Sequence, residues 1–126
     1  MPPPTTPPAS PAPLPPARVA ITGASGLVGR ALTADLTAMG TAVIPVVRGT
    51  RREGVRWDPA GGWLDGAGLE GVDAVIHLAG EPIDGGRWTA GRKARIRDSR
   101  VHGTRLLARG LAGLTRPPRV LISGSA

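Results

Sequence analysis

Three glycines, Gly23, Gly26 and Gly29, follow a short apolar run and open a stretch with helical spacing. The run, residues 18–22, is rich in β-branched and apolar side chains, which favour a strand. Gly23 permits a tight turn, Gly26 lets backbone amides approach phosphates, and Gly29 lets the helix pack closely on the strand. The N-terminus of that helix supplies unpaired N–H donors and a partial positive charge. The pattern predicts the pyrophosphate site of a dinucleotide; the less favoured alternative is a glycine-rich turn that binds nothing.

The residues after the glycines support this prediction. Val28, Leu32, Leu36 and Met39 fall at helical spacing, so we expect them on one face of a helix over about residues 27–39. Gly40 then ends the helix as a left-handed cap would.

Strands and helices alternate along the remaining chain. A strand over 42–47 is expected from its apolar content, although Pro45 lacks an amide donor and should lie at an end or a distortion of a ladder. The alternation predicts an α/β fold, a Rossmann-type doubly wound parallel sheet of order 3-2-1-4-5 that stops after the fifth strand. The expected strands are 19–22, 42–47, 55–58, 74–78 and 120–123, with one long helix or two across 89–114.

Composition sets the boundaries of the domain. Residues 1–16 alternate proline with small residues and are expected to form a disordered tail, which leaves 17–126 as one NAD(P)-binding Rossmann domain. The chain has no cysteine and only two histidines, His77 and His102, so we expect no disulfide and no metal site. No stretch has the length of a membrane span or the pattern of a secretory signal. A cytoplasmic protein without a membrane partner is expected.

The net charge of +7 raises the question of nucleic acid. We do not favour nucleic acid as a partner, because the arginines are spread from Arg18 to Arg119 and the chain has neither tyrosine nor phenylalanine to stack on bases. The expected partner is a small-molecule substrate, and no nucleic acid.

Arginines rather than acids follow the second expected strand. An NAD site carries an acidic residue about 20 positions beyond the glycines, which accepts hydrogen bonds from the adenosine ribose. This chain has no Asp or Glu between Asp35 and Glu53, whereas Arg48 ends the strand and Arg51 and Arg52 follow. The pattern favours a 2′-phosphate, hence NADP over NAD. Ordinary loop arginines are the alternative.

Two further strand ends should face the same ligand edge, because ligands of open α/β sheets lie outside the carboxyl ends of the strands. Leu78, Ala79 and Gly80 end the fourth strand, where small residues leave room for the cofactor. Ser125 follows the fifth, where its hydroxyl is placed to hydrogen-bond a substrate. His77 precedes its strand end without an evident partner, so we interpret it as a packed core histidine.

These motifs together resemble the extended and atypical branch of the short-chain dehydrogenase/reductase superfamily, within its epimerase/dehydratase-like subfamily. The segments that carry the resemblance are residues 22–29 (TGASGLVG), 57–59 (WDP), 77–83 (HLAGEPI), 87–89 (RWT), 97–100 (RDSR), 103–104 (GT) and 122–126 (ISGSA). The likeness covers nearly all of the chain after the tail.

The resemblance implies roles for individual residues. Ser125 matches the superfamily's catalytic serine, Asp58 the acid that contacts the adenine amine, and Ala79 with Gly80 the backbone that lines the cofactor. Ser25 and Leu27, inside the glycine turn, complete the implied cofactor contacts. The resemblance also leaves open a homodimer, paired through the helix expected within 89–114.

One element of the family pattern is missing from these residues. The family's Tyr-x-x-x-Lys pair, in which tyrosine is the acid or base, follows the fifth strand, but this chain has no tyrosine and its only lysine is Lys93. We therefore expect the cofactor-binding N-terminal part of a longer NAD(P)-dependent oxidoreductase or epimerase. Its expected substrate is a small hydroxyl or carbonyl compound, a class that includes nucleotide-linked ones, and we expect these residues alone to be inactive. The alternative is a non-catalytic dinucleotide sensor or interaction module.

Overall fold

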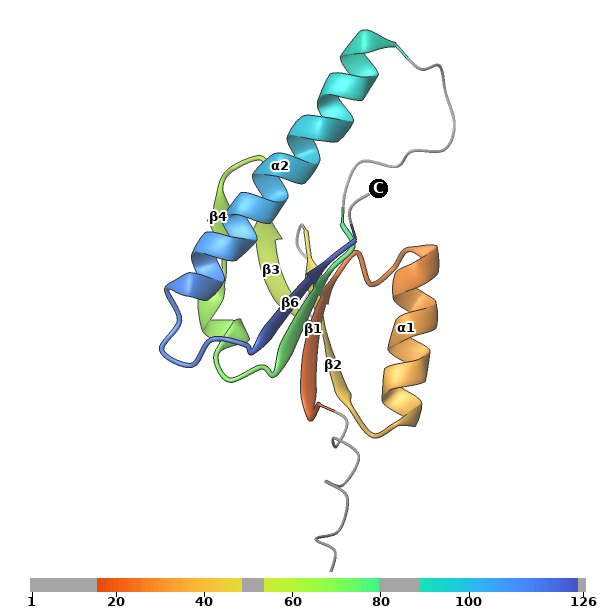
Figure 1. The fold of residues 1–126 in the computed structure, drawn as a ribbon, viewed down its shortest axis with the longest axis vertical. Coiled ribbons are helices and arrows are strands. Elements are labelled where there is room, and N and C mark those ends of the chain that lie inside the picture. Colours follow the sequence, from red (N-terminus) through yellow and green to blue (C-terminus); the bar gives the residue numbers. More distant parts are fainter. Residues whose placement is uncertain (1–15, 49–53, 80–88, 125–126) are drawn as a thin grey trace, which may run out of the picture.

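The computed structural model describes residues 16–48, 54–79 and 89–124, apart from the side chains of Arg92, Ile96 and Ser99. A central sheet lies between two helices, with α1 on one face and α2 on the other (Figure 1). The predicted tail, except for Pro16, lies outside the described residues.

The sheet has the order β4-β3-β2-β1-β5-β6. Its strands are β1 (Arg18–Thr22), β2 (Ala42–Val47), β3 (Val55–Asp58), β4 (Trp63–Leu64), β5 (Ala74–His77) and β6 (Val120–Ser123). All neighbouring pairs are parallel except β3 with β4, which is antiparallel. The α/β fold and the order predicted for the five parallel strands are confirmed, and the hairpin strand β4 is an addition that the sequence analysis missed.

The helices have bounds close to those expected. α1 covers Leu27–Ala38 and α2 covers Ala90–Ala112, while a single turn of 3-10 helix, η1, spans Gly66–Leu69 before β5. Gly40 has φ of +87° after the end of α1, which confirms the left-handed position expected there. Within the part of the chain that the structure describes, neither α-helix combines the length and the apolar character that a membrane span needs.

Pro45 lies inside β2, opposite Ile21 of β1. Pairing between β2 and β3 begins only at the next residue, where Val46 meets Val55. The proline therefore sits at the beginning of that ladder, which agrees with the expectation that it marks an end.

Each face of the sheet has its own apolar cluster. On the α1 face, Val19 and Ile21 pack with Leu36, while Leu32 lies against them partly buried. The α2 face is larger and is built from these buried residues: Ala20, Val46, Val55, Trp57, Leu69, Val72, Val75, Leu107 and Leu111. Alternate residues of β1 thus serve opposite clusters, as the two-residue period of a strand buried on both sides requires.

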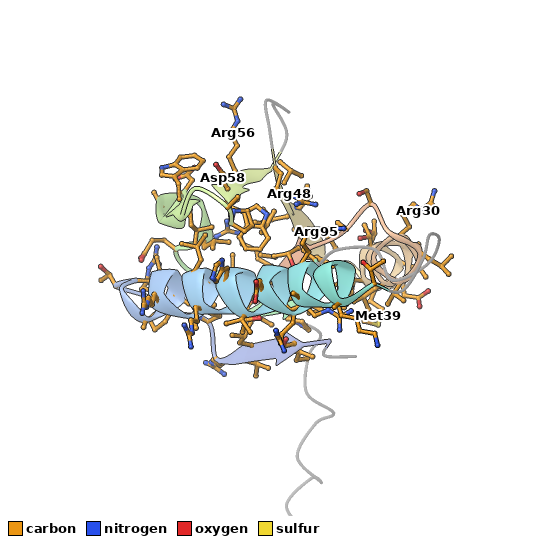
Figure 2. The ribbon with its side chains drawn as sticks, turned by 90° about the horizontal axis from the view of Figure 1, so that it is seen from above. Arg30, Met39, Arg48, Arg56, Asp58 and Arg95 are labelled. Atoms are coloured by element: carbon orange, nitrogen blue, oxygen red, sulfur yellow. The ribbon has the colours of Figure 1, made fainter. Side chains whose placement is uncertain are left out.

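Of the four apolar residues expected on one face of α1, only the middle two lie against the sheet. Leu36 is buried, but Val28 is 62% exposed and Met39, which Figure 2 labels beside α1, is 55% exposed. Val28 belongs to the first turn, which starts from the carboxyl edge of the sheet, and Met39 is already the C-cap. Helical spacing therefore identified the correct stripe, whereas only its middle has a strand beneath it.

Gly29 is a helical position at which the fold leaves no room for a side chain. A Cβ there would lie 2.7 Å from the Cα of Ala24 and closer still to the carbonyl oxygen of Gly23, so the backbone would have to shift. We expect Gly29→Ala to lower the free energy of unfolding by about 1–3 kcal/mol, despite the better helix propensity of alanine. Urea unfolding followed by circular dichroism measures the change.

The matched control is Gly91→Ala in the first turn of α2. Its added Cβ would meet only the Arg95 guanidinium, at 3.8 Å. Unfolding free energy should stay level or rise by up to about 1 kcal/mol in this variant. Equal losses in the two variants would contradict the steric explanation.

Candidate functional site

A cavity of about 810 Å³ opens at the carboxyl edge of the sheet, between the turn after β1, α1 and the end of β2. Its size suits a small organic ligand or cofactor. It is lined by Gly23, Ala24, Ser25, Gly26, Arg30, Thr33, Ala34, Val43, Pro45, Val46, Val47, Arg48, Trp57, Leu78 and Ala79. The glycine turn and the ends of β2 and β5 therefore meet at one site, as the strand-end argument predicted.

Gly23, the first of the three glycines, makes the tight turn that was predicted for it. Its φ is +70°, in the left-handed region that side chains disfavour. A Cβ at this position would also come within 2.9 Å of the Ala79 backbone nitrogen and of the Leu78 carbonyl carbon. The turn after β1 thus rests directly on the end of β5, backbone against backbone.

Gly26 differs from Gly23 and Gly29 because a Cβ on it would clash with no backbone atom. The nearest other atom is the carbonyl oxygen of Gly23, at 3.4 Å, and its φ of −74° is one that any residue adopts. Its amide donates to that same oxygen at 3.1 Å, which closes the turn. The missing side chain at Gly26 is therefore not required by the fold, and it leaves the helix start open towards the cavity.

The helix start carries no internal anion. Gly26 is the N-cap of α1 without a side-chain cap hydrogen bond, and the first turn of α1 has no acidic residue. Unpaired N–H donors at such an end attract negative charge. This arrangement is what a bound phosphate group would use.

Two arginines from different elements line the cavity. Arg48 follows β2, as predicted, and Arg30 lies on α1, with Figure 2 labelling both. The sequence analysis did not single out Arg30 or its neighbour Thr33. Their spacing from Gly26 could have indicated them. Arg30 and Thr33 follow Gly26 by four and seven positions, and residues at these spacings lie on the same face of a helix.

The other predicted site residues, for the cofactor and for catalysis, divide into those that line the cavity, those that do not, and those outside the described residues. Ser25, Leu78 and Ala79 line the cavity, whereas Leu27 is 82% exposed and does not. The carboxylate of Asp58 lies in the β3–β4 turn, where it would contact a Cβ on Gly61, and Asp58 is not among the lining residues (Figure 2). Gly80 and Ser125 lie outside the described residues, so their roles stay predictions.

His77 is buried on the α2 face of the sheet, where the interpretation as a core histidine placed it. Its Nδ1 lies 2.6 Å from the hydroxyl oxygen of Thr22. The Trp57 ring meets the imidazole edge-on, with centroids 5.8 Å apart. Burial lowers the pKa of His77 below its ordinary value. Among the described residues, no cluster of three or more potential metal ligands is present.

Comparison with known proteins identifies the family. Residues 19–126 match the NAD dependent epimerase/dehydratase family. The chain belongs to this family. The resemblance noted from the motifs is thereby confirmed.

Relatives extend well beyond this chain. An epimerase family protein of Mycobacterium bovis is 42% identical over 96 residues, which cover 75% of this chain and 32% of that protein. The human epimerase family protein SDR39U1 is 35% identical over 113 residues, which cover 86% of this chain and 37% of that protein. The chain thus spans about a third of the length of these relatives.

Solved structures of the same family share the fold. A nucleoside-diphosphate sugar epimerase from Corynebacterium glutamicum is 43% identical with a TM-score of 0.69, over 88% of this chain and 23% of that one. Human SDR39U1 solved with NADPH is 32% identical with a TM-score of 0.71, over 84% of this chain and 35% of that one. A dinucleotide-binding domain of the short-chain dehydrogenase/reductase type is therefore established for the described residues.

The burial of His77 predicts a dependence of stability on pH. The folded state holds the neutral ring, so its pKa lies below the value of about 6.5 found in an unfolded chain. As pH falls through that unfolded value, the unfolded state takes up the proton first and the unfolding free energy falls. We expect urea midpoints to drop between pH 7.5 and pH 5, and to drop less in His77→Asn.

The comparison variant is His102→Asn, on the exposed surface of α2. It should keep the wild-type dependence on pH. The burial argument fails if His77→Asn and the wild type lose stability in parallel.

Proposed function

We propose that this chain binds NADP at the cavity beside the glycine turn. The observation that carries the proposal is the contrast among the glycines: side chains at Gly23 and Gly29 would strike backbone, whereas one at Gly26 would strike none and would occupy the space at the helix start. A pyrophosphate needs that space and the amide donors beside it. Human SDR39U1, solved with NADPH, supports the assignment as a relative.

The arginines favour NADP over NAD within this proposal. Arg48 and Arg30 line one cavity, from the end of β2 and from α1. A guanidinium binds phosphate oxygens through paired donors, and its charge complements the 2′-phosphate. An Agrobacterium tumefaciens member of the superfamily was solved with NAD, so cofactor choice varies among relatives and must be assigned from this chain's own residues.

The reaction proposed for the whole protein is oxidoreduction or epimerisation of a small hydroxyl or carbonyl compound, with a nucleotide-linked sugar as one member of that class. NADP would supply the acceptor or donor of a hydride. The described residues would contribute binding and orientation: Gly26 and the start of α1 hold the pyrophosphate, and Arg48 with Arg30 hold the 2′-phosphate. Ser125 remains our proposed contact to the reacting oxygen of the substrate.

Gly26→Val tests the phosphate site. The branched side chain should occupy the space of the pyrophosphate while the backbone keeps an allowed conformation, so NADPH affinity should fall at least about tenfold with little change in stability. Calorimetric titration with NADPH and thermal unfolding of the same samples measure both quantities.

The control for this test is Ala38→Val, which adds a branched side chain at the exposed far end of α1. It should leave NADPH affinity at the wild-type value. The site is refuted if Gly26→Val binds as tightly as this control, or if the wild-type chain binds no dinucleotide at all.

Arg48→Asp and Arg30→Asp test the choice of cofactor. Each replaces an attractive charge by a repulsive one, so the ratio of NADPH to NADH affinity should fall about tenfold or more. Arg105→Asp on the exposed face of α2 makes the same change in net charge and should leave the ratio unaltered. An unchanged ratio in Arg48→Asp would remove that residue from the 2′-phosphate role, and the same reasoning applies to Arg30.

A further inference from the structure

The hydroxyl of Thr22 is a buried junction between β1 and β5. Its oxygen accepts hydrogen bonds from the backbone amides of Leu78 and Ala79, each at 3.0 Å, and the Leu78 amide is shared with the carbonyl oxygen of Thr22, at 3.1 Å. The same oxygen lies 2.6 Å from Nδ1 of His77. Thr22 and His77 are register partners on adjacent parallel strands, so their side chains share one face of the sheet.

The number of donors and acceptors fixes the direction of the third bond. A hydroxyl has two acceptor sites and one proton, and the two amides occupy the acceptor sites. We infer from this that Thr22 donates its proton to His77, which makes Nδ1 an acceptor and places the ring proton on Nε2. A doubly protonated imidazole has no acceptor and would break this arrangement.

The imidazole has little freedom to turn away from Thr22. Trp57 of β3 meets it edge-on, at an interplanar angle of 85°. The backbone of α2 is also close: a Cβ on Gly103 would lie 3.6 Å from Cε1 of His77 and 3.4 Å from the Trp57 ring. Two neighbouring elements therefore hold the ring where its Nδ1 can accept the Thr22 proton.

This junction joins two walls of the cavity. Thr22 immediately precedes Gly23, while Leu78 and Ala79 line the cavity from the end of β5. The two walls touch, since a Cβ on Gly23 would lie 2.9 Å from the same Ala79 nitrogen that donates to Thr22. Without the hydroxyl, the Ala79 amide would lose its bond to Thr22, and the bond from the Leu78 amide to the Thr22 carbonyl oxygen, at 3.1 Å, would remain between these two segments.

We propose that Thr22 and His77 form a positioning pair for the dinucleotide site: His77 orients the Thr22 hydroxyl, and the hydroxyl holds the Gly23 turn against the end of β5. This inference rests on the proposed function. Neither residue is placed in contact with the cofactor. The pair acts through the spacing of the two walls, so its loss weakens binding even where the chain stays folded.

The test compares isosteric and conservative variants at a temperature where circular dichroism shows each to be fully folded. Thr22→Val keeps the shape but removes the hydroxyl, and Thr22→Ser restores it. His77→Leu removes the acceptor, while His77→Asn returns one close to the position of Nδ1. We expect NADPH affinity to fall about tenfold in Thr22→Val and His77→Leu, and to lie within about twofold of wild type in Thr22→Ser and His77→Asn.

The double variant Thr22→Val/His77→Leu separates a shared role from two independent ones. It should bind NADPH no more weakly than either single variant, because each single change already breaks the pair. Additive losses would overturn the proposal, as would wild-type affinity in Thr22→Val or His77→Leu. A wild type that binds no NADPH would instead refute the proposed function.

A second measurement needs no variant. Nitrogen-15 NMR of the wild-type chain reports which imidazole nitrogen of His77 carries the proton. The proposal requires protonated Nε2 and unprotonated Nδ1 at neutral pH. Protonated Nδ1 would overturn it, even if the substitutions prevent folding.

Discussion

Close contact between backbone segments at the end of β1 is the constraint on which the rest of the structure depends. Gly23 lies against Ala79 on one side and against Gly29 on the other, with distances that leave no room for a side chain at either glycine. The start of α1 is thereby fixed over the carboxyl ends of β1 and β5. Because the glycine turn and the end of β5 also line the cavity, this backbone contact fixes one of its walls.

Much of the fold was predictable because it rests on short-range patterns. The bounds of β2, β3 and β6 agree with the sequence analysis, since each is an apolar or alternating run between turn-forming residues. β4 was missed because a two-residue strand has no periodicity of its own and exists only through pairing with Trp57 and Asp58. Val28 and Met39 are exposed although they share the spacing of the apolar stripe, because spacing locates the apolar face of a helix but not how far the sheet beneath it extends.

The site was predictable where a residue has a sterically special backbone. Gly23 and Gly29 have that property, and Arg48 follows from its place at a strand end. Arg30 and Thr33 were not found, since exposed polar residues on a helix have many ordinary explanations until the cavity is seen. The hydroxyl of Thr22 was equally hidden: its partners Leu78 and Ala79 are 56 and 57 positions away and contribute only backbone amides.

The uncapped N-terminus of α1 also affects which dissolved ions the protein binds. With no carboxylate in the first turn and no capping side chain, water or small dissolved anions are the natural partners of those amides whenever a dinucleotide is not there. Phosphate or sulfate in a buffer would compete for the same donors, whereas chloride or a neutral zwitterion would compete less strongly. Apparent affinities for a dinucleotide will therefore depend on the identity of the buffer anion as well as on ionic strength.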